Sequence, residues 1–134
     1  MADASNTPRV DILRSPLGRV RGLGSARSGS RGWLMERITA LALVPLTIWF
    51  VFAAIGLTGA TRADVAGWLS APWNMALMLA LVVATFHHMH LGLQVVIEDY
   101  VDHDQAKMTL VLAIKGLTFL LAAVCIVSIL RLGL

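Results

Sequence analysis

Three long runs of apolar residues dominate this chain, and polar segments separate them. The runs lie at about 38–57, 72–97 and 108–130. A helix needs about 20 predominantly apolar residues to cross the hydrocarbon layer of a bilayer. The pattern therefore predicts an all-α integral membrane protein with three transmembrane helices, which form a membrane domain over residues 32–134.

The polar segments predict a tail and two loops. Residues 1–31 are rich in Arg, Gly and Ser, and we interpret them as a retained cytoplasmic tail, with a mitochondrial transit peptide as the alternative. Residues 56–70 and the acidic residues 99–105 are predicted as short loops. Pro45 inside the first run predicts a local kink, which membrane helices tolerate.

Composition and charge exclude several classes of protein. The chain has 134 residues, of which 57% are hydrophobic and 14% charged, so little remains for a catalytic domain outside the membrane. The net charge of +3 does not indicate nucleic-acid binding, because seven arginines precede or open the first run. Basic residues there and at Lys107 predict a cytoplasmic N-terminus and an outside C-terminus.

Ionisable residues cluster in the C-terminal half of the second run: His87, His88, His90, Glu98 and Asp99. Such groups are costly at membrane depth and mark cofactors, partner helices or proton paths. Successive helical residues are rotated by about 100°, so His88, Gly92 and Asp99 share one face. His87 and His90 lie about 100° and 200° away from His88.

His88 is a candidate axial ligand of haem iron, because imidazole is a common protein ligand of that metal. Gly92, one turn away, would let a flat macrocycle or another helix approach closely. The alternative for His88 is a hydrogen bond between helices. His87 and His90, at i and i+3, are candidates for a zinc or copper site or for polar contacts between helices.

Two motifs together resemble the hydrophobic membrane anchor subunit of succinate dehydrogenase (succinate:quinone oxidoreductase, complex II), in its alpha-proteobacterial and mitochondrial branch. The first is His88-x-x-x-Gly92 followed by Gln94-Val95-Val96-Ile97-Glu98-Asp99-Tyr100, and the second is Trp33-Leu34-Met35-Glu36-Arg37-Ile38-Thr39-Ala40. The Asp-Tyr pair, eleven and twelve residues after the histidine, is the specific part. The resemblance covers the chain from about residue 29 onward.

The resemblance implies particular roles for four residues. His88 would be the axial ligand of a b-type haem shared with a sister cytochrome b anchor subunit. Tyr100 would donate a hydrogen bond to ubiquinone, supported by Asp99, and a neutral phenol suits this role because it adds no charge in lipid. Arg37 would approach the haem propionates or the quinone pocket. The alternatives are an interfacial anchor for Tyr100 and a positive-inside anchor for Arg37.

The resemblance also implies partners and a location. The flavoprotein and iron–sulfur subunits would dock on the inner face and pass electrons from succinate to ubiquinone, while this chain alone would catalyse nothing. The location would be the bacterial cytoplasmic membrane, with a periplasmic C-terminus, or the mitochondrial inner membrane. The alternatives are a fumarate reductase anchor with reversed flux, and a metal-binding or structural membrane protein that uses His87 and His90.

Overall fold

The computed structural model describes residues 29–134, which form four helices without a strand. These are α2 (Gly29–Gly56), α3 (Arg62–Leu69), α4 (Pro72–Tyr100) and α5 (Asp104–Gly133). The all-α prediction is confirmed for this part of the chain. The interpretation of residues 1–31 as a tail or a transit peptide falls mostly on residues 1–28, outside the described residues, whereas residues 29–31 already belong to α2.

Helices α2, α4 and α5 are each long and apolar enough to cross a membrane, which confirms the three predicted spans. They contain 28, 29 and 30 residues. At 1.5 Å per residue they are roughly 42–45 Å long, whereas the hydrocarbon layer is about 30 Å thick. Most helix ends lie outside the predicted apolar runs. The additional turns are long enough to reach into the interfacial region on either side of the hydrocarbon layer.

The loop predicted over residues 56–70 is wrong in part, because it contains α3. Thr61 is the N-cap of this helix, and its Oγ1 accepts a hydrogen bond from the Asp64 N–H at 3.3 Å. The Thr61 N–H donates in turn to Asp64 Oδ2 at 2.9 Å, which completes a capping box. The side-chain and backbone hydrogen bonds from Thr61 lower the pKa of the Asp64 carboxyl group. The Thr-x-x-Asp spacing was the sequence signal for this helix.

The acidic loop predicted over residues 99–105 is also shorter than expected. Helix α4 continues to Tyr100 and α5 begins at Asp104, so only residues 101–103 connect them. Asp104 lies in the first turn of α5, where the helix dipole favours a carboxylate. Lys107 Nζ donates to the Glu98 carbonyl oxygen at 3.0 Å and so joins the start of α5 to the end of α4.

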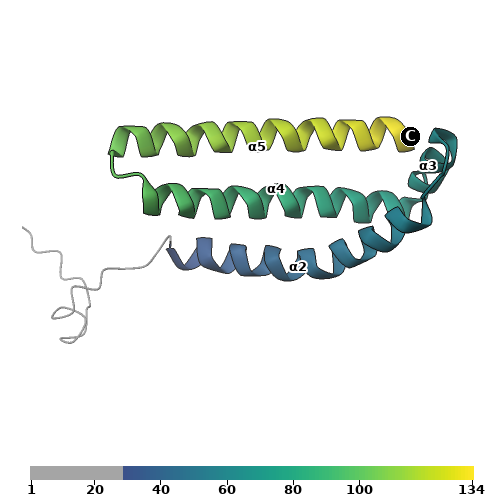
Figure 1. Cartoon of the computed structure of the whole chain (residues 1–134), viewed down its shortest axis with the longest axis horizontal. Coiled ribbons are helices and arrows are strands. Elements are labelled where there is room, and N and C mark those ends of the chain that lie inside the picture. Colours follow the sequence, from purple (N-terminus) through teal and green to yellow (C-terminus); the bar gives the residue numbers. More distant parts are fainter. Residues whose placement is uncertain (1–28) are drawn as a thin grey trace, which may run out of the picture.

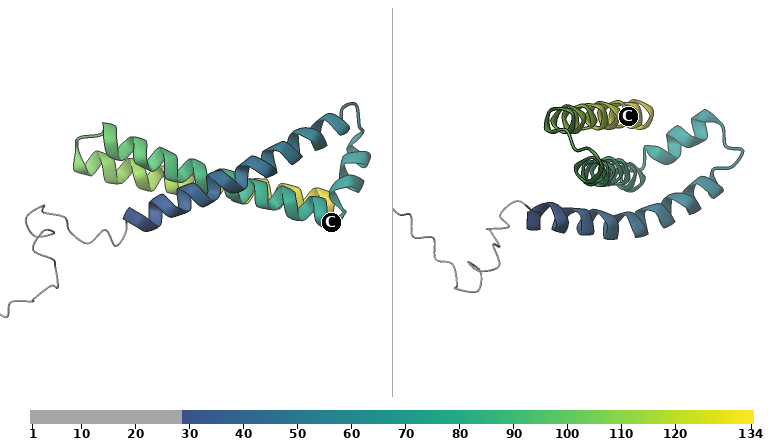
Figure 2. Two further views of the ribbon diagram at one scale, coloured as in Figure 1. Left: turned by 90° about the horizontal axis from the view of Figure 1, so that it is seen from below. Right: turned by 60° about the vertical axis from the view of Figure 1, so that its left-hand side comes forward.

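The three long helices form a layer rather than a closed bundle. Helix α4 lies between α2 and α5 and contacts both, whereas α2 and α5 do not contact each other (Figure 1). Helix α2 runs through Pro45 without ending, crosses α4 obliquely and curves along its length (Figure 2). Few described side chains are buried, and large apolar ones are exposed along α2 and α5. Such surfaces suit lipid or other membrane helices.

Helix α3 packs against α4 and α5 at the end of the layer where α5 terminates (Figure 1). Trp68 of α3 stacks on Trp49 of α2, with ring centroids 5.8 Å apart. Gly133 of α5 is buried, and a Cβ atom there would lie 3.2 Å from the Leu69 carbonyl oxygen. This close approach depends on glycine. The start of α2 and the α4–α5 connection lie together at the opposite end.

Candidate functional site

The histidines of α4 face two different neighbours. His88 is half-buried, and its Nδ1 lies 3.1 Å from Thr39 Oγ1 on α2. His87 and His90 instead line a groove that α4 forms with α5. The rotation of about 100° per helical residue accounts for this separation. His88 is therefore set apart from the other two histidines by its position on the helix.

His88 has one ring nitrogen engaged and the other free. The contact with Thr39 is the only hydrogen bond of this ring within residues 29–134. Within the same residues, its Nε2 has no hydrogen-bond partner and is not fully buried. A Cβ atom at Gly92, one turn further, would meet nothing within 4 Å. An accessible imidazole nitrogen beside open space fits the donor that haem iron requires.

Tyr100 is the last residue of α4, and its side chain is 82% exposed. Asp99 beside it is also exposed, and neither side chain has a hydrogen-bond partner within the described chain. Glu98 is engaged, because its Oε1 accepts from Gln94 Nε2 at 2.7 Å. The phenol and the Asp99 carboxyl group are thus available to a molecule or subunit outside this chain.

The structure does not bring Tyr100 and His88 together. The two residues are twelve positions apart on one straight helix, which separates them by about 18 Å along its axis. The two side chains therefore do not form a single site within this chain.

Arg37 lies on α2, two residues before Thr39. Its guanidinium carbon is 5.6 Å from the centroid of the Trp33 ring, one turn earlier on the same helix. This is a cation–π contact, which favours Arg over the ring face. Within the described chain the guanidinium contacts neither Asp99 nor Tyr100. The structure thus places Arg37 on the helix that contacts His88 but gives it no carboxylate partner.

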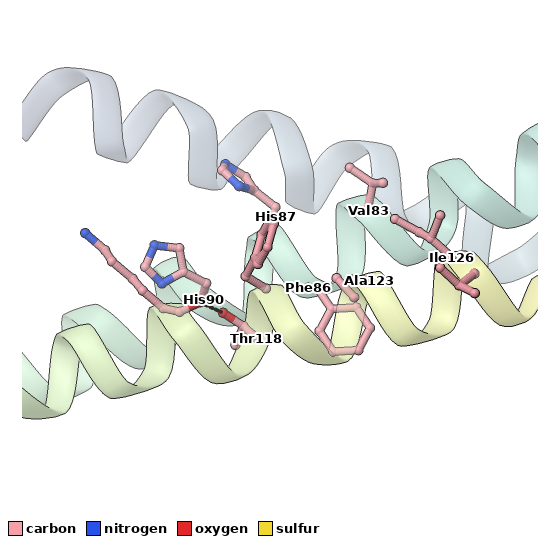
Figure 3. Close-up of a pocket in the computed structure, with 11 residues that line it drawn as sticks. Val83, Phe86, His87, His90, Thr118, Ala123 and Ile126 are labelled. Carbon is pink, nitrogen blue, oxygen red and sulfur yellow. Dashed lines mark hydrogen bonds between the residues drawn. The ribbon is translucent and has the colours of Figure 1, made fainter.

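His87 and His90 occupy the polar end of a groove of about 550 Å³ between α4 and α5, whose other end is lined by Val83 and Ile126 (Figure 3). Their ring centroids are 6.5 Å apart. His90 Nδ1 is buried without a hydrogen-bond partner, and Lys115 of α5 lines the same groove. Among residues 29–134, no three His, Cys, Asp or Glu side chains gather as a metal site. The two histidines therefore lack a third protein ligand of these types.

Comparison with known proteins decides the family of this chain. Residues 11–125 match the succinate dehydrogenase/fumarate reductase transmembrane subunit family. The chain belongs to this family. The match begins earlier than the predicted resemblance, which started near residue 29.

Two curated relatives carry the name succinate dehydrogenase hydrophobic membrane anchor subunit. The protein of Rickettsia bellii (strain RML369-C) is 32% identical over 117 residues, which cover 87% of this chain and 94% of the relative. The protein of Rickettsia conorii (strain ATCC VR-613 / Malish 7) is 29% identical over 104 residues, which cover 77% and 82%. The resemblance to this type of anchor subunit is confirmed.

The region shared with the transmembrane subunit family contains all of α2, α3 and α4, and therefore Thr39, His88, Asp99 and Tyr100. Sequence reasoning assigned roles to the last three of these residues. Thr39 appeared only as one residue of the motif at 33–40 and received no role, because several other Thr and Ser residues also occur in the apolar helices. Its contact with His88 joins residues 49 positions apart and depends on how α2 crosses α4.

Proposed function

We propose that this chain is a membrane anchor of a succinate dehydrogenase and forms half of a b-type haem site and half of a ubiquinone-reducing site with a sister anchor subunit. The observation that carries the proposal is the placement of His88. This residue lies inside a membrane-spanning helix, with Nδ1 held by α2 and Nε2 accessible. Family membership adds support, because the two curated relatives are named as succinate dehydrogenase anchors.

On the haem side, His88 would hold the haem iron through Nε2, together with a residue of the sister subunit. A bound b-type haem would supply a one-electron redox centre. Gly92 leaves space next to His88, because no atom lies within 4 Å of the position where its Cβ would be. Arg37, exposed on the neighbouring helix, is a partner for the propionate groups.

On the quinone side, Tyr100 donates a hydrogen bond to one carbonyl oxygen of ubiquinone, and Asp99 supports it. The phenol is neutral at pH 7 and can polarise this oxygen without placing a charge in the lipid. Since the side chain is 82% exposed, the remaining walls of the quinone pocket come from other subunits. Reduction to quinol consumes two electrons and two protons, and a site at the end of α4 lies close to water.

The side of the membrane on which the soluble subunits dock follows from the end of the helical layer that carries Tyr100. The start of α2, which carries Arg31 and Arg37, lies at the same end as the α4–α5 connection (Figure 1). Positive charge favours the cytoplasmic side of a bacterial inner membrane. We place the flavoprotein and iron–sulfur subunits on this side, beside Tyr100. In a eukaryotic cell the corresponding location is the mitochondrial inner membrane.

The main alternative within the family is a fumarate reductase anchor. The family description includes both enzymes, and both would use the same helical architecture. The curated relatives favour succinate oxidation, because they are named as succinate dehydrogenase subunits. The quinone that copurifies with the complex distinguishes the two, since fumarate reduction requires a quinone of lower potential than ubiquinone.

A reduced-minus-oxidised visible spectrum of the purified complex tests the haem half of the proposal. We expect a sharp b-type band together with ubiquinone-dependent succinate oxidation. A complex without this band, but with bound zinc or copper, would instead support the metal-binding alternative for His87 and His90.

The proposed orientation predicts the location of the C-terminus. A reporter enzyme that is active only after export should be active when fused after Leu134. The same reporter should be inactive when inserted within residues 101–103, because that connection lies on the cytoplasmic side. Activity assays on whole cells check both fusions. Cytoplasmic reporter activity at the C-terminus would contradict the three-span orientation.

A further inference from the structure

The hydroxyl group of Thr39 contacts three other atoms. Its Oγ1 lies 2.8 Å from the Met35 carbonyl oxygen, 3.0 Å from the Glu36 carbonyl oxygen and 3.1 Å from His88 Nδ1. A hydroxyl group has a single proton to donate and two lone pairs with which to accept. The direction of the hydrogen bond to His88 therefore depends on where the Thr39 proton points.

Other hydroxyl groups in α2 and α5 indicate the arrangement that we expect for this proton. Each donates to the carbonyl oxygen four residues earlier at 2.6–2.8 Å: Thr47, Thr109, Thr118 and Ser128. Thr39 has the same geometry toward Met35, which is a common arrangement of Ser and Thr inside helices. With its proton on its own helix, Thr39 can only accept from His88. The hydrogen of the neutral imidazole is then on Nδ1.

The proton on Nδ1 determines the state of the other ring nitrogen. A neutral imidazole has one N–H group, so a protonated Nδ1 leaves Nε2 with its lone pair free. Metal-bound histidines generally donate their second ring N–H to an oxygen acceptor, which fixes the ring and makes the ligand more basic. We propose that Thr39 is a positioning residue that holds His88 in the Nδ1–H tautomer and presents Nε2 as the haem ligand. This inference rests on the proposed haem role of His88.

The other two histidines of α4 lack such a support. His90 Nδ1 is buried without a hydrogen-bond partner, and His87 has no hydrogen bond within the described chain. No oxygen atom of residues 29–134 sets the tautomer of either ring. Of these three side chains, His88 alone has an acceptor on a neighbouring helix. The structure thus distinguishes one histidine by a hydrogen bond that suits a metal ligand.

The test uses the assembled complex and four variants of this chain, of which His88→Ala tests the proposed ligand itself. Thr39→Val removes the hydroxyl group but keeps nearly the same side-chain shape. Thr39→Ser keeps the hydroxyl group and removes only the methyl group. Thr47→Val is the matched control, because Thr47 lies on the same helix and makes the same bond to its own carbonyl, four residues earlier, but no bond to another helix. Subunit stoichiometry is measured for each variant to verify assembly.

Two haem measurements report on the His88 ring itself. The first is retention of haem against excess apo-globin, where Thr39→Val should lower the apparent affinity by on the order of 10–100-fold, the usual cost of losing such a supporting group. The second is the haem midpoint potential, which should rise because a less basic imidazole stabilises ferric iron less. Thr39→Ser should lie close to the parent complex, and Thr47→Val should match it.

The outcomes separate this inference from the proposed function. If Thr39→Val and Thr47→Val both retain haem as the parent complex does, with the same midpoint potential, the positioning role is overturned while the haem role of His88 stands. If both valine variants lose haem equally, the role is merely structural and the inference is also overturned. If the haem spectrum persists unchanged in His88→Ala, the proposed ligand itself is wrong and Thr39 loses its function with it.

Discussion

Replacing His88 with alanine is expected to abolish or shift the b-type band in the reduced-minus-oxidised spectrum of the complex. Among residues 29–134, His88 is the only histidine of α4 whose ring is held from a neighbouring helix, through Nδ1, while its Nε2 is not fully buried. Removing a supporting group of a metal ligand costs on the order of 10–100-fold in affinity, and we expect removal of the ligand itself to cost more. Haem content per complex and the visible spectrum measure the effect.

His90→Ala is the matched control for this experiment. His90 lies two residues away on the same helix but lines the groove against α5. Its replacement should leave the axial ligation of the haem intact. The reverse ranking, in which His90→Ala loses the band and His88→Ala keeps it, would show that the wrong histidine is assigned.

Replacing Tyr100 with phenylalanine should slow ubiquinone reduction by several-fold to tens-fold. The change removes one hydroxyl group, and a hydrogen bond is worth about 0.5–1.5 kcal/mol net, or more when the acceptor gains charge. Each ~1.4 kcal/mol corresponds to a tenfold change in rate. Because the side chain is 82% exposed, the fold of this chain should tolerate the loss. Steady-state succinate:ubiquinone activity measures the effect.

Succinate oxidation with an artificial acceptor is the internal control. Such an acceptor takes electrons from the soluble subunits and bypasses this chain, so its rate should be unchanged in Tyr100→Phe. If ubiquinone reduction also stays at the parent rate, Tyr100 is only an interfacial anchor. A parallel fall of both activities would indicate defective assembly and leave the hydrogen bond to quinone without support.

The helical elements were predictable to different degrees for physical reasons. The three spans follow from the length of the apolar runs, because a bilayer imposes a minimum number of apolar residues on each crossing. Helix α3 was missed, because its eight residues are too few to show an apolar pattern. The only sequence signal for this helix is the capping box of Thr61 and Asp64. The helices extend beyond the predicted apolar runs, because hydropathy follows the hydrocarbon layer rather than the backbone hydrogen bonds.

The candidate site was predictable as far as it lies on a single helix. The order of residues along α4 is enough to put His88 and Gly92 on one face, to put His87 and His90 elsewhere, and to leave Asp99 and Tyr100 at the end of the helix. These relations depend only on the regular rotation and rise of a helix. The family also follows from sequence alone, since the match spans residues 11–125.

Only the tertiary structure decided which neighbour each face of α4 meets. The contact between Thr39 and His88 depends on the crossing of α2 over α4, and the groove beside His87 and His90 depends on the packing of α5. Such crossings result from the fit of many side chains along two helices, and no local pattern specifies them. The amino-acid sequence thus determined that His88 stands apart from the other histidines. The packing of α2 determined which side-chain oxygen lies within hydrogen-bond distance of its ring.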